Sequence, residues 1–305
     1  MFPDAFDQKH FLVEETDYLV MIGGAGAPLL LLHGFPQTHL CWDLVAPALA
    51  ENHTVIAPDL RGYGGSTAPM GGPRGEGYSK REMAAELVHL MSALGHDQFA
   101  VVGHDRGARV AYRMALDHPH KITRLAVLNI VPTIEQFERM SGGPSLGYWP
   151  WYLLAQPAPL PERLLSADPA AVLDHAFDTW SSDPAAIIPE HRAAYLEAMT
   201  PRTADAICAD YRASFFLDRD HDAADRANGR RISAPTLMVT GAEEIQLNDA
   251  PAIWRSWAAQ VSAKRVPGGH SCPRRLRTRS CPCLRSSSAA EAPNLADVNT
   301  SGMSG

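Results

Sequence analysis

The sequence has few cysteines, no long apolar run and no excess of positive charge. The longest aliphatic run, Leu29 to Leu32, is too short to span a bilayer, and residues 1–15 lack the apolar segment of a secretory signal. The formal net charge of −7 leaves no positive excess to attract phosphate groups. We therefore expect a cytoplasmic protein that binds neither membranes nor nucleic acids.

The five cysteines are an odd number, which does not suit the paired framework of a small secreted domain. Cys281 and Cys283 are separated by one residue instead of the two that are usual in zinc sites, and no second pair follows. We expect free thiols, and a chemistry that needs neither a metal nor an organic cofactor.

A chain of 305 residues with 46% hydrophobic content suits one large α/β domain with an insertion. Short apolar runs at residues 29–32, 54–57 and 99–102 end in loops, and an amphipathic helix is predicted over 79–94. This alternation predicts a mostly parallel, twisted sheet flanked by helices.

The composition along the chain predicts four parts. Residues 1–133 and 230–270 form the two parts of the α/β core, and residues 134–229, rich in proline and aromatic side chains, form an inserted helical cap. Residues 271–305 carry five arginines and three cysteines without a helical stripe, which predicts an aberrant, disordered tail. A frameshift, an altered terminus or a divergent tail would each explain it.

Residues 99–109 form an apolar run that ends in a turn around Asp105. Gly103, Gly107 and Ala108 keep this turn small, as at a sharp strand-to-helix junction that presents a nucleophile. A carboxylate nucleophile gives an alkyl-enzyme ester. This favours substrates in which a halide or an epoxide oxygen leaves a saturated carbon, and it disfavours ester and amide substrates. The alternative is that Asp105 only caps the following helix.

The partners of such a nucleophile meet it beyond the carboxyl ends of the strands. His270 follows the last predicted strand and is the candidate base that activates water. The backbone N–H groups of Phe35 and Arg106 are the candidate oxyanion donors. Arg106 and Arg109 follow Asp105 by one and four positions and suit a substrate carboxylate, unless they are solvated helix residues.

The chain resembles the fluoroacetate dehalogenases, which are α/β-hydrolases that act on haloacetates. The resemblance covers about residues 10–270 and is carried by four motifs, at residues 33–38, at 103–109, at Trp151 with 153–159, and at 208–213. It implies an α/β-hydrolase fold, a small haloacid substrate and a homodimer. It also implies that Asp105 is the nucleophile, that Arg106 and Arg109 hold the carboxylate, that Trp151 and Tyr211 donate to the departing halide, and that His270 activates water.

Two positions depart from the family pattern. Asn129 stands where the family has the acid of the triad, and an amide cannot stabilise an imidazolium by charge. We hypothesise that Glu244, in the loop after the next strand, replaces this acid; the alternative is a solvated loop carboxylate. Pro150 stands where the family has a histidine beside the halide, so we expect chloroacetate and bromoacetate to be preferred over fluoroacetate.

Two other functions stay open. An epoxide hydrolase would use the same Asp105 nucleophile, with Tyr148, Tyr152 or Tyr211 to protonate the epoxide oxygen. From another class, the chain could be a catalytically silent fold that binds small carboxylates, or a damaged gene product.

Overall fold

The computed structural model describes residues 2–181 and 187–270, so the predicted tail over 271–305 lies outside the described residues. The described part contains one sheet of eight strands in the order β1-β2-β4-β3-β5-β6-β7-β8. The strands are β1 (Asp7–Val13), β2 (Thr16–Gly23), β3 (Ala27–Leu32), β4 (His53–Pro58), β5 (Phe99–His104), β6 (Ile122–Leu128), β7 (Thr236–Gly241) and β8 (Val261–Val266).

The sheet is parallel from β4 to β8, which confirms the predicted α/β class. The antiparallel strands β1 and β2 extend it at one edge and were not predicted from the sequence. Parallel strands place their carboxyl ends at one edge, and the loops after β3, β5, β6, β7 and β8 therefore start from the same side of the sheet.

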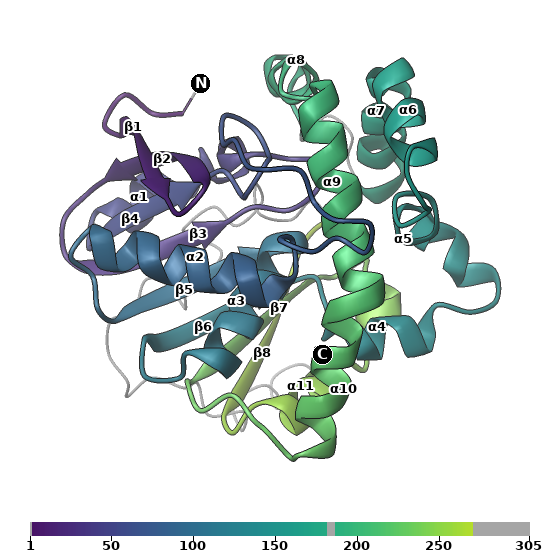
Figure 1. Ribbon diagram of the computed structural model, residues 1–305. Coiled ribbons are helices and arrows are strands. Elements are labelled where there is room, and N and C mark those ends of the chain that lie inside the picture. Colours follow the sequence, from purple (N-terminus) through teal and green to yellow (C-terminus); the bar gives the residue numbers. More distant parts are fainter. Residues whose placement is uncertain (1, 182–186, 271–305) are drawn as a thin grey trace, which may run out of the picture.

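Both faces of the central strands are buried. Leu30 and Leu32 pack in the cluster that contains side chains of α2 (Lys80–Ala93) and α3 (Arg106–Asp117), whereas Leu29 and Leu31 pack in the cluster with α1 (Ala46–Ala50). Alternate residues of a strand point to opposite faces, so one short apolar run feeds both layers. Figure 1 shows α2 and α3 in front of the sheet.

The predicted helix over 79–94 is confirmed as α2, which begins with a capping box. The Ser79 hydroxyl accepts from the Glu82 N–H, and the Glu82 carboxylate accepts from the Ser79 N–H. This reciprocal pair satisfies backbone donors that the first helical turn leaves open.

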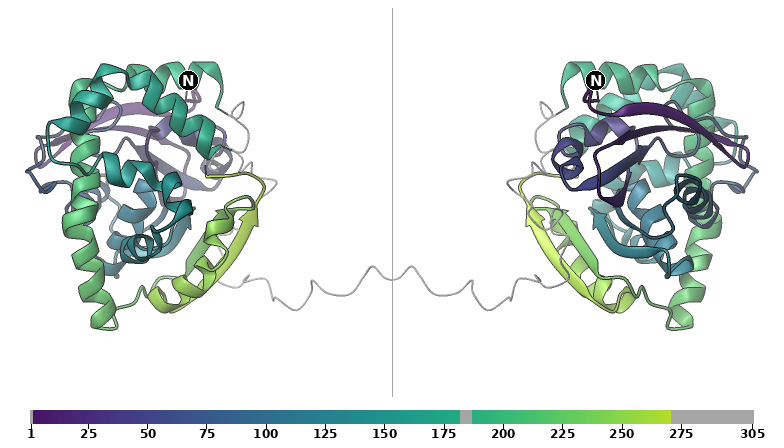
Figure 2. Two further views of the ribbon diagram at one scale, coloured as in Figure 1. Left: turned by 90° about the vertical axis from the view of Figure 1, so that its right-hand side faces the viewer. Right: turned by 90° about the vertical axis from the view of Figure 1, so that its left-hand side faces the viewer.

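Between β6 and β7, the described residues form a series of α-helices, which we call the helical segment. They are α4 (Thr133–Arg139), α5 (Trp149–Leu153), α6 (Leu160–Ala167), α7 (Pro169–Trp180), α8 (Pro189–Glu197), α9 (Pro201–Ala213) and α10 (Arg219–Ala227). A π-helical stretch, Ser214–Asp218, joins α9 to α10. Figures 1 and 2 show this segment gathered along one side of the sheet, with α9 and α10 forming one long helix.

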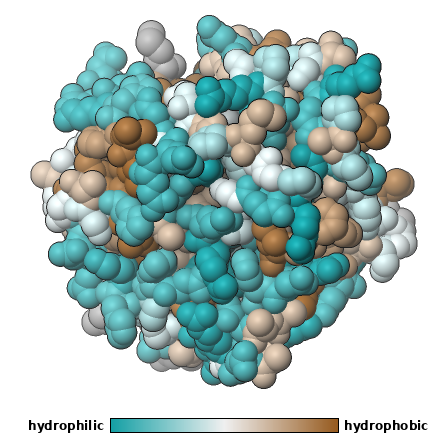
Figure 3. Space-filling model, in the orientation of Figure 1, coloured by the Kyte–Doolittle hydropathy of each residue, from teal (hydrophilic) through white to brown (hydrophobic). Residues whose placement is uncertain are grey.

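The last described helix, α11 (Ala250–Trp257), packs through Trp254 against Tyr112 of α3, with ring centroids 5.7 Å apart. The outer surface in Figure 3 is mainly hydrophilic, with hydrophobic residues in separate small groups. Within the described part of the chain, no helix is long and apolar enough to cross a membrane.

Candidate active site

Asp105 lies at the sharp junction between β5 and α3. Its backbone adopts φ 45° and ψ −113°, a strained conformation for a residue with a side chain. The turn needs small neighbours, because a Cβ on Gly107 would lie 2.3 Å from the His33 carbonyl oxygen and a Cβ on Gly34 would lie 2.6 Å from the Asp105 Cβ. The Asp105 side chain makes no capping hydrogen bond, so the helix-cap alternative is wrong.

The Asp105 carboxylate has two different neighbours. The Phe35 N–H donates to Oδ2 at 3.1 Å, and the His270 Nε2 lies 3.7 Å from Oδ1. Burial alone would raise the pKa of Asp105, but pairing with His270 and the nearby charges of His104 and Arg106 outweigh it, and the pKa lies well below its usual range. Asp105 is thus held as a carboxylate.

His270 follows β8 and is fixed mainly through its backbone. Its N–H donates to the Trp180 carbonyl at 3.0 Å, and its carbonyl oxygen lies 2.8 Å from the His104 Nε2. Burial acts to lower the pKa of His270, but the charges of Asp105 and Glu244 outweigh this effect and raise the pKa above its ordinary value. The structure therefore places the predicted base beside the predicted nucleophile.

Asn129 lies directly after β6 with a positive φ of 57°. Its Nδ2 donates to the His270 carbonyl at 2.7 Å and to the Gly269 carbonyl at 3.4 Å, while its Oδ1 accepts from the Gly241 N–H at 2.8 Å. The amide thus joins the end of β7 to the backbone of the loop that carries His270. A carboxylate could accept the Gly241 bond but could not donate to the two carbonyls.

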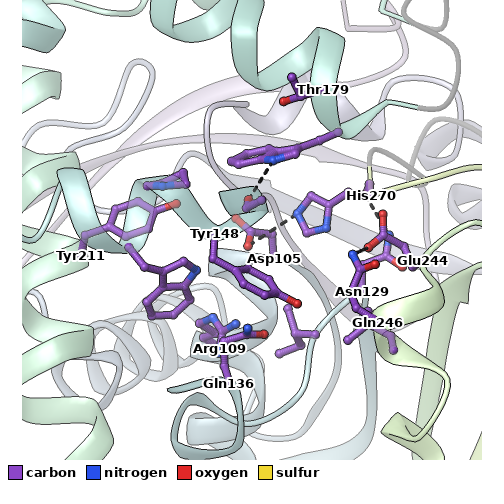
Figure 4. A pocket seen from close by; sticks show the side chains of 16 residues that line it. Asp105, Arg109, Asn129, Gln136, Tyr148, Thr179, Tyr211, Glu244, Gln246 and His270 are labelled. Atoms are coloured by element: carbon purple, nitrogen blue, oxygen red, sulfur yellow. Dashed lines mark hydrogen bonds and ion pairs between the residues drawn. The ribbon is translucent and has the colours of Figure 1, made fainter. Parts of the chain in front are cut away.

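Glu244 lies in the loop between β7 and α11 and is buried, which excludes the alternative of a solvated loop carboxylate. Burial raises the pKa of Glu244, and the charge of His270 and a hydrogen bond from Gln246 oppose this rise. Figure 4 shows Glu244 on the side of His270 that faces away from Asp105. Its charge therefore acts on His270 from the side opposite Asp105.

The two predicted arginines have different environments. Arg106 is fully buried, and its Nε and Nη2 each donate to the Asp210 carboxylate at 2.8 Å. Nη2 also donates to the Ser214 hydroxyl at 2.6 Å, and Lys80 pairs with the same carboxylate. We expected both guanidinium groups to face one substrate. The structure brings only Arg109 to the wall of the cavity beside Asp105, because Arg106 does not line it.

Arg109 lines the cavity, and its partners in the described part of the chain are neutral. Its Nη1 donates to the Val131 carbonyl and to the Thr133 hydroxyl, both at 3.2 Å. Among the described residues, no carboxylate lies within ion-pairing distance of it, and its Nε has no hydrogen-bond acceptor. Burial, reinforced by the positive charge of Arg106, lowers the pKa of Arg109. A buried cation without an anionic partner is costly, so this position favours the binding of an anion.

Trp151 and Tyr211, the predicted halide donors, come from α5 and α9 and also line the cavity. Their ring centroids are 5.6 Å apart in an edge-to-face arrangement. The Arg109 guanidinium lies over the Trp151 ring at 4.5 Å. The helical segment thus brings both aromatic side chains to the cavity wall, and Figure 4 shows Tyr211 on the side of Asp105 that faces away from His270.

The cavity has a volume of about 250 Å³ and contains Asp105 in its wall. This is near the lower end of ligand pockets and suits a small substrate. Its lining residues are Asp105, Arg109, Asn129, Ile130, Gln136, Gly147, Tyr148, Pro150, Trp151, Thr179, Trp180, Tyr211, Glu244, Gln246, Leu247 and His270. In the described part of the chain, no group of three or more His, Cys, Asp or Glu side chains could hold a metal ion.

Comparison with known proteins gives the family. The model of the alpha/beta hydrolase fold matches residues 27–269. This chain belongs to the α/β-hydrolase family. It is 39% identical to a fluoroacetate dehalogenase from Burkholderia sp. over 271 residues, which is 88% of each chain. It is also 49% identical to a soluble epoxide hydrolase from Corynebacterium sp. (strain C12), over 36% of each chain.

Solved structures of similar α/β-hydrolases agree in fold over most of this chain. A putative alpha/beta hydrolase from Nostoc sp. PCC 7120 superposes with a TM-score of 0.86 at 42% identity, covering 90% of this chain and 96% of that one. A variant of a putative epoxide hydrolase from Pseudomonas aeruginosa with bound MFA has a TM-score of 0.86 at 37% identity, covering 92% and 95%.

Sequence reasoning missed several residues of this α/β-hydrolase site. Trp180 packs edge-to-face against His270 with centroids 5.5 Å apart, and its Nε1 donates to the Gly147 carbonyl at 3.3 Å. Gln136 and Gln246 line the cavity as well. A glutamine or tryptophan in a helical stretch carries no spacing signal of its own, so only the packing of the helical segment reveals these positions.

Proposed function

We propose that this α/β-hydrolase hydrolyses short 2-halo acids to 2-hydroxy acids and halide. The observation that carries the proposal is Arg109, a buried cation without a carboxylate partner among the described residues, in the same cavity as the carboxylate of Asp105. A substrate carboxylate on Arg109 supplies the missing charge and orients the halogen-bearing carbon toward Asp105. Residues 134–229 act as the cap that closes this cavity.

In the first step, Asp105 attacks the carbon that bears the halogen. Oδ1 is the attacking atom, because Oδ2 already accepts the Phe35 N–H. The new C–O bond forms as the carbon–halogen bond breaks, and the halide leaves with the bonding electrons. Trp151 and Tyr211 donate to the halide as its charge grows.

In the second step, water hydrolyses the ester. Alkylation removes the negative charge of Asp105, so the pKa of His270 falls once the ester has formed and the imidazole becomes a competent base. His270 takes a proton from water, and the hydroxide attacks the carboxyl carbon of Asp105. Phe35 and Arg106 N–H groups hold the oxyanion. When the oxyanion collapses, the C–O bond between the carboxyl carbon of Asp105 and the alkoxide breaks, and the alkoxide takes the proton from His270 and leaves as the hydroxy acid. The re-formed carboxyl group of Asp105 releases its proton to solvent and is again a carboxylate.

Glu244 supports this second step as the acid of the triad. Its charge raises the pKa of His270 and stabilises the imidazolium that forms when water is deprotonated. Asn129 has the separate task of holding the His270 loop through its amide. The absence of a histidine at Pro150 weakens halide stabilisation, which supports a preference for chloride and bromide over fluoride as leaving groups.

Epoxide hydrolysis is the second candidate. Tyr148 and Tyr211 line the cavity and could protonate an epoxide oxygen, whereas the Tyr152 hydroxyl donates to the Met140 carbonyl and does not line the cavity. The unpaired charge of Arg109 favours an acidic substrate over a neutral epoxide.

The test is halide release from chloroacetate, bromoacetate and fluoroacetate, with diol formation from styrene oxide measured beside it. We expect chloride release that disappears in Asp105→Ala, and slower release of fluoride. Diol formation without halide release would favour the epoxide hydrolase, and binding without turnover would favour the silent carboxylate binder. The homodimer stays a prediction, which sedimentation of the purified protein would check.

A further inference from the structure

Gln136 is a buried polar side chain of the cavity wall that has no evident structural task. It lies on α4, is 3% exposed and lines the cavity beside Asp105. Its Nε2 has no hydrogen-bond acceptor among the described residues. Buried amide donors are normally paired, so an unpaired one in the wall of a cavity indicates a ligand that supplies the acceptor.

Gln136 lies at the same end of the cavity as Arg109. Gln136 follows Thr133 by three residues on α4, so the side chains of Thr133 and Gln136 project from the same side of this helix. The Arg109 guanidinium, which belongs to α3, donates to the Thr133 hydroxyl on that side. Figure 4 shows Gln136 and Arg109 together at this end of the cavity. The Arg109 Nε is a second buried donor without an acceptor.

Two unpaired donors at one end of a cavity fit a group that has two acceptor oxygens. A carboxylate has this geometry and accepts from both oxygens. Arg106 is less well placed to be the second anchor, because it does not line the cavity and its Nε and Nη2 already donate to the Asp210 carboxylate. The two acids in the cavity wall, Asp105 and Glu244, are paired with or directed toward His270.

We propose that Gln136 and Arg109 form a two-point anchor for the carboxylate of the substrate, with Gln136 supplying a second donor in the cavity wall, which Arg106 does not line. This inference rests on the proposed function and names a further specificity-determining residue for it. Gln136 discriminates an ionised carboxylate from a neutral group of the same size, because only the anion strengthens the hydrogen bond from the amide.

The test compares chloroacetate with chloroacetamide, which replaces the carboxylate by a neutral amide of similar shape. In Gln136→Leu, we expect kcat/KM for chloroacetate to fall roughly 10- to 100-fold, mainly through KM, the range for losing a hydrogen bond to a charged group. Chloroacetamide should change much less. The matched control is Gln98→Leu, since the Gln98 amide donates to the His120 carbonyl on the surface. Asp105→Ala gives the rate of unspecific alkylation.

An equal loss for both substrates would mean that Gln136 only supports the fold, and an unchanged chloroacetate rate would also overturn the inference. Calorimetric binding of glycolate to Asp105→Asn is the second readout, and it does not depend on turnover. We expect binding that weakens when Gln136→Leu is added. If the wild type releases no halide but this weakening is observed, the proposed function fails while the anchor stands; no binding, or equal binding by both variants, overturns the anchor.

Discussion

Arg106 and Arg109 lie one helical turn apart on α3, are both fully or nearly fully buried, and are expected to respond oppositely to substitution. We consider Arg106→Met and Arg109→Met, which keep a long side chain and remove the charge. Arg106 is paired with a carboxylate, whereas the partners of Arg109 within residues 2–181 and 187–270 are all neutral. The two variants therefore separate a stabilising ion pair from a charge kept for binding.

Arg106→Met leaves Asp210 buried with one of its two cationic partners removed. Breaking a buried pair costs about 3 to 5 kcal/mol, and the remaining contact of Asp210 with Lys80 favours the lower end. A loss of about 3 kcal/mol in the free energy of unfolding corresponds to a decrease of roughly 6 to 12 °C in Tm for a domain of this size.

Arg109→Met removes two hydrogen bonds to neutral acceptors, each contributing about 0.5 to 1.5 kcal/mol, and a contact with the Trp151 ring. It also removes an unpaired buried cation, whose desolvation opposes these gains. We expect a free energy of unfolding within about 1 kcal/mol of wild type, or roughly 2 to 4 °C in Tm. For chloroacetate we expect a loss of about 3 to 4 kcal/mol of binding energy, which is roughly 10²- to 10³-fold in kcat/KM.

Thermal unfolding followed by circular dichroism, with chloride release on the same preparations, measures both quantities. Two results would count against this reasoning. One is an Arg109→Met variant that unfolds as early as Arg106→Met. The other is an Arg109→Met variant that keeps wild-type kcat/KM for chloroacetate.

Glu244→Gln should slow ester hydrolysis by roughly 10²- to 10⁴-fold, because His270 loses the charge that stabilises its imidazolium. Mass spectrometry should then detect the accumulated alkyl-enzyme, with Glu243→Gln as the matched control. Full turnover by Glu244→Gln would contradict the assignment. Asn129→Asp should not raise activity. A carboxylate cannot donate to the two carbonyls, and losing these two hydrogen bonds costs about 1 to 3 kcal/mol, so Tm should fall by roughly 2 to 12 °C. A faster and equally stable variant would show that the amide is not needed. In stopped-flow experiments, the first-turnover release of halide should stay constant through the pH range where carboxylates ordinarily titrate, because the pKa of Asp105 lies well below it. The steady-state rate should fall as the pH decreases, since protonated His270 is no base, and parallel loss of both phases would refute the two-step assignment.

Local signals in the sequence were enough for the core of the fold. The apolar run at residues 29–32, the capped helix after Ser79 and the small residues around Asp105 each specify a structure through nearby side chains alone. The antiparallel strands β1 and β2 were not predicted. They pair with each other locally, but β2 joins the sheet only through its pairing with β4, a distant part of the chain.

The site was predicted less completely than the fold. Asp105, Phe35 and His270, which we propose as nucleophile, oxyanion donor and base, are marked by motifs, and the structure brings them together. The hydrogen bonds of Asn129 were not predicted. An acid at this position of a triad contacts the histidine ring, so the sequence led us to expect Asn129 beside the His270 ring. In the structure, the Asn129 amide instead donates to the backbone carbonyls of residues 269 and 270.

The sequence by itself determined that a carboxylate stands at the elbow and that two arginines follow it, since these depend on residue identity and on helical spacing. Only the tertiary structure decided which arginine is paired with a carboxylate of the protein and which one lines the cavity. Asp210 lies on α9, more than a hundred positions from Arg106, and it pairs with that arginine through two hydrogen bonds. Electrostatic pairing acts over a few ångströms in space, whatever the distance along the chain, so the difference between Arg106 and Arg109 arises only when the helical segment packs on the sheet.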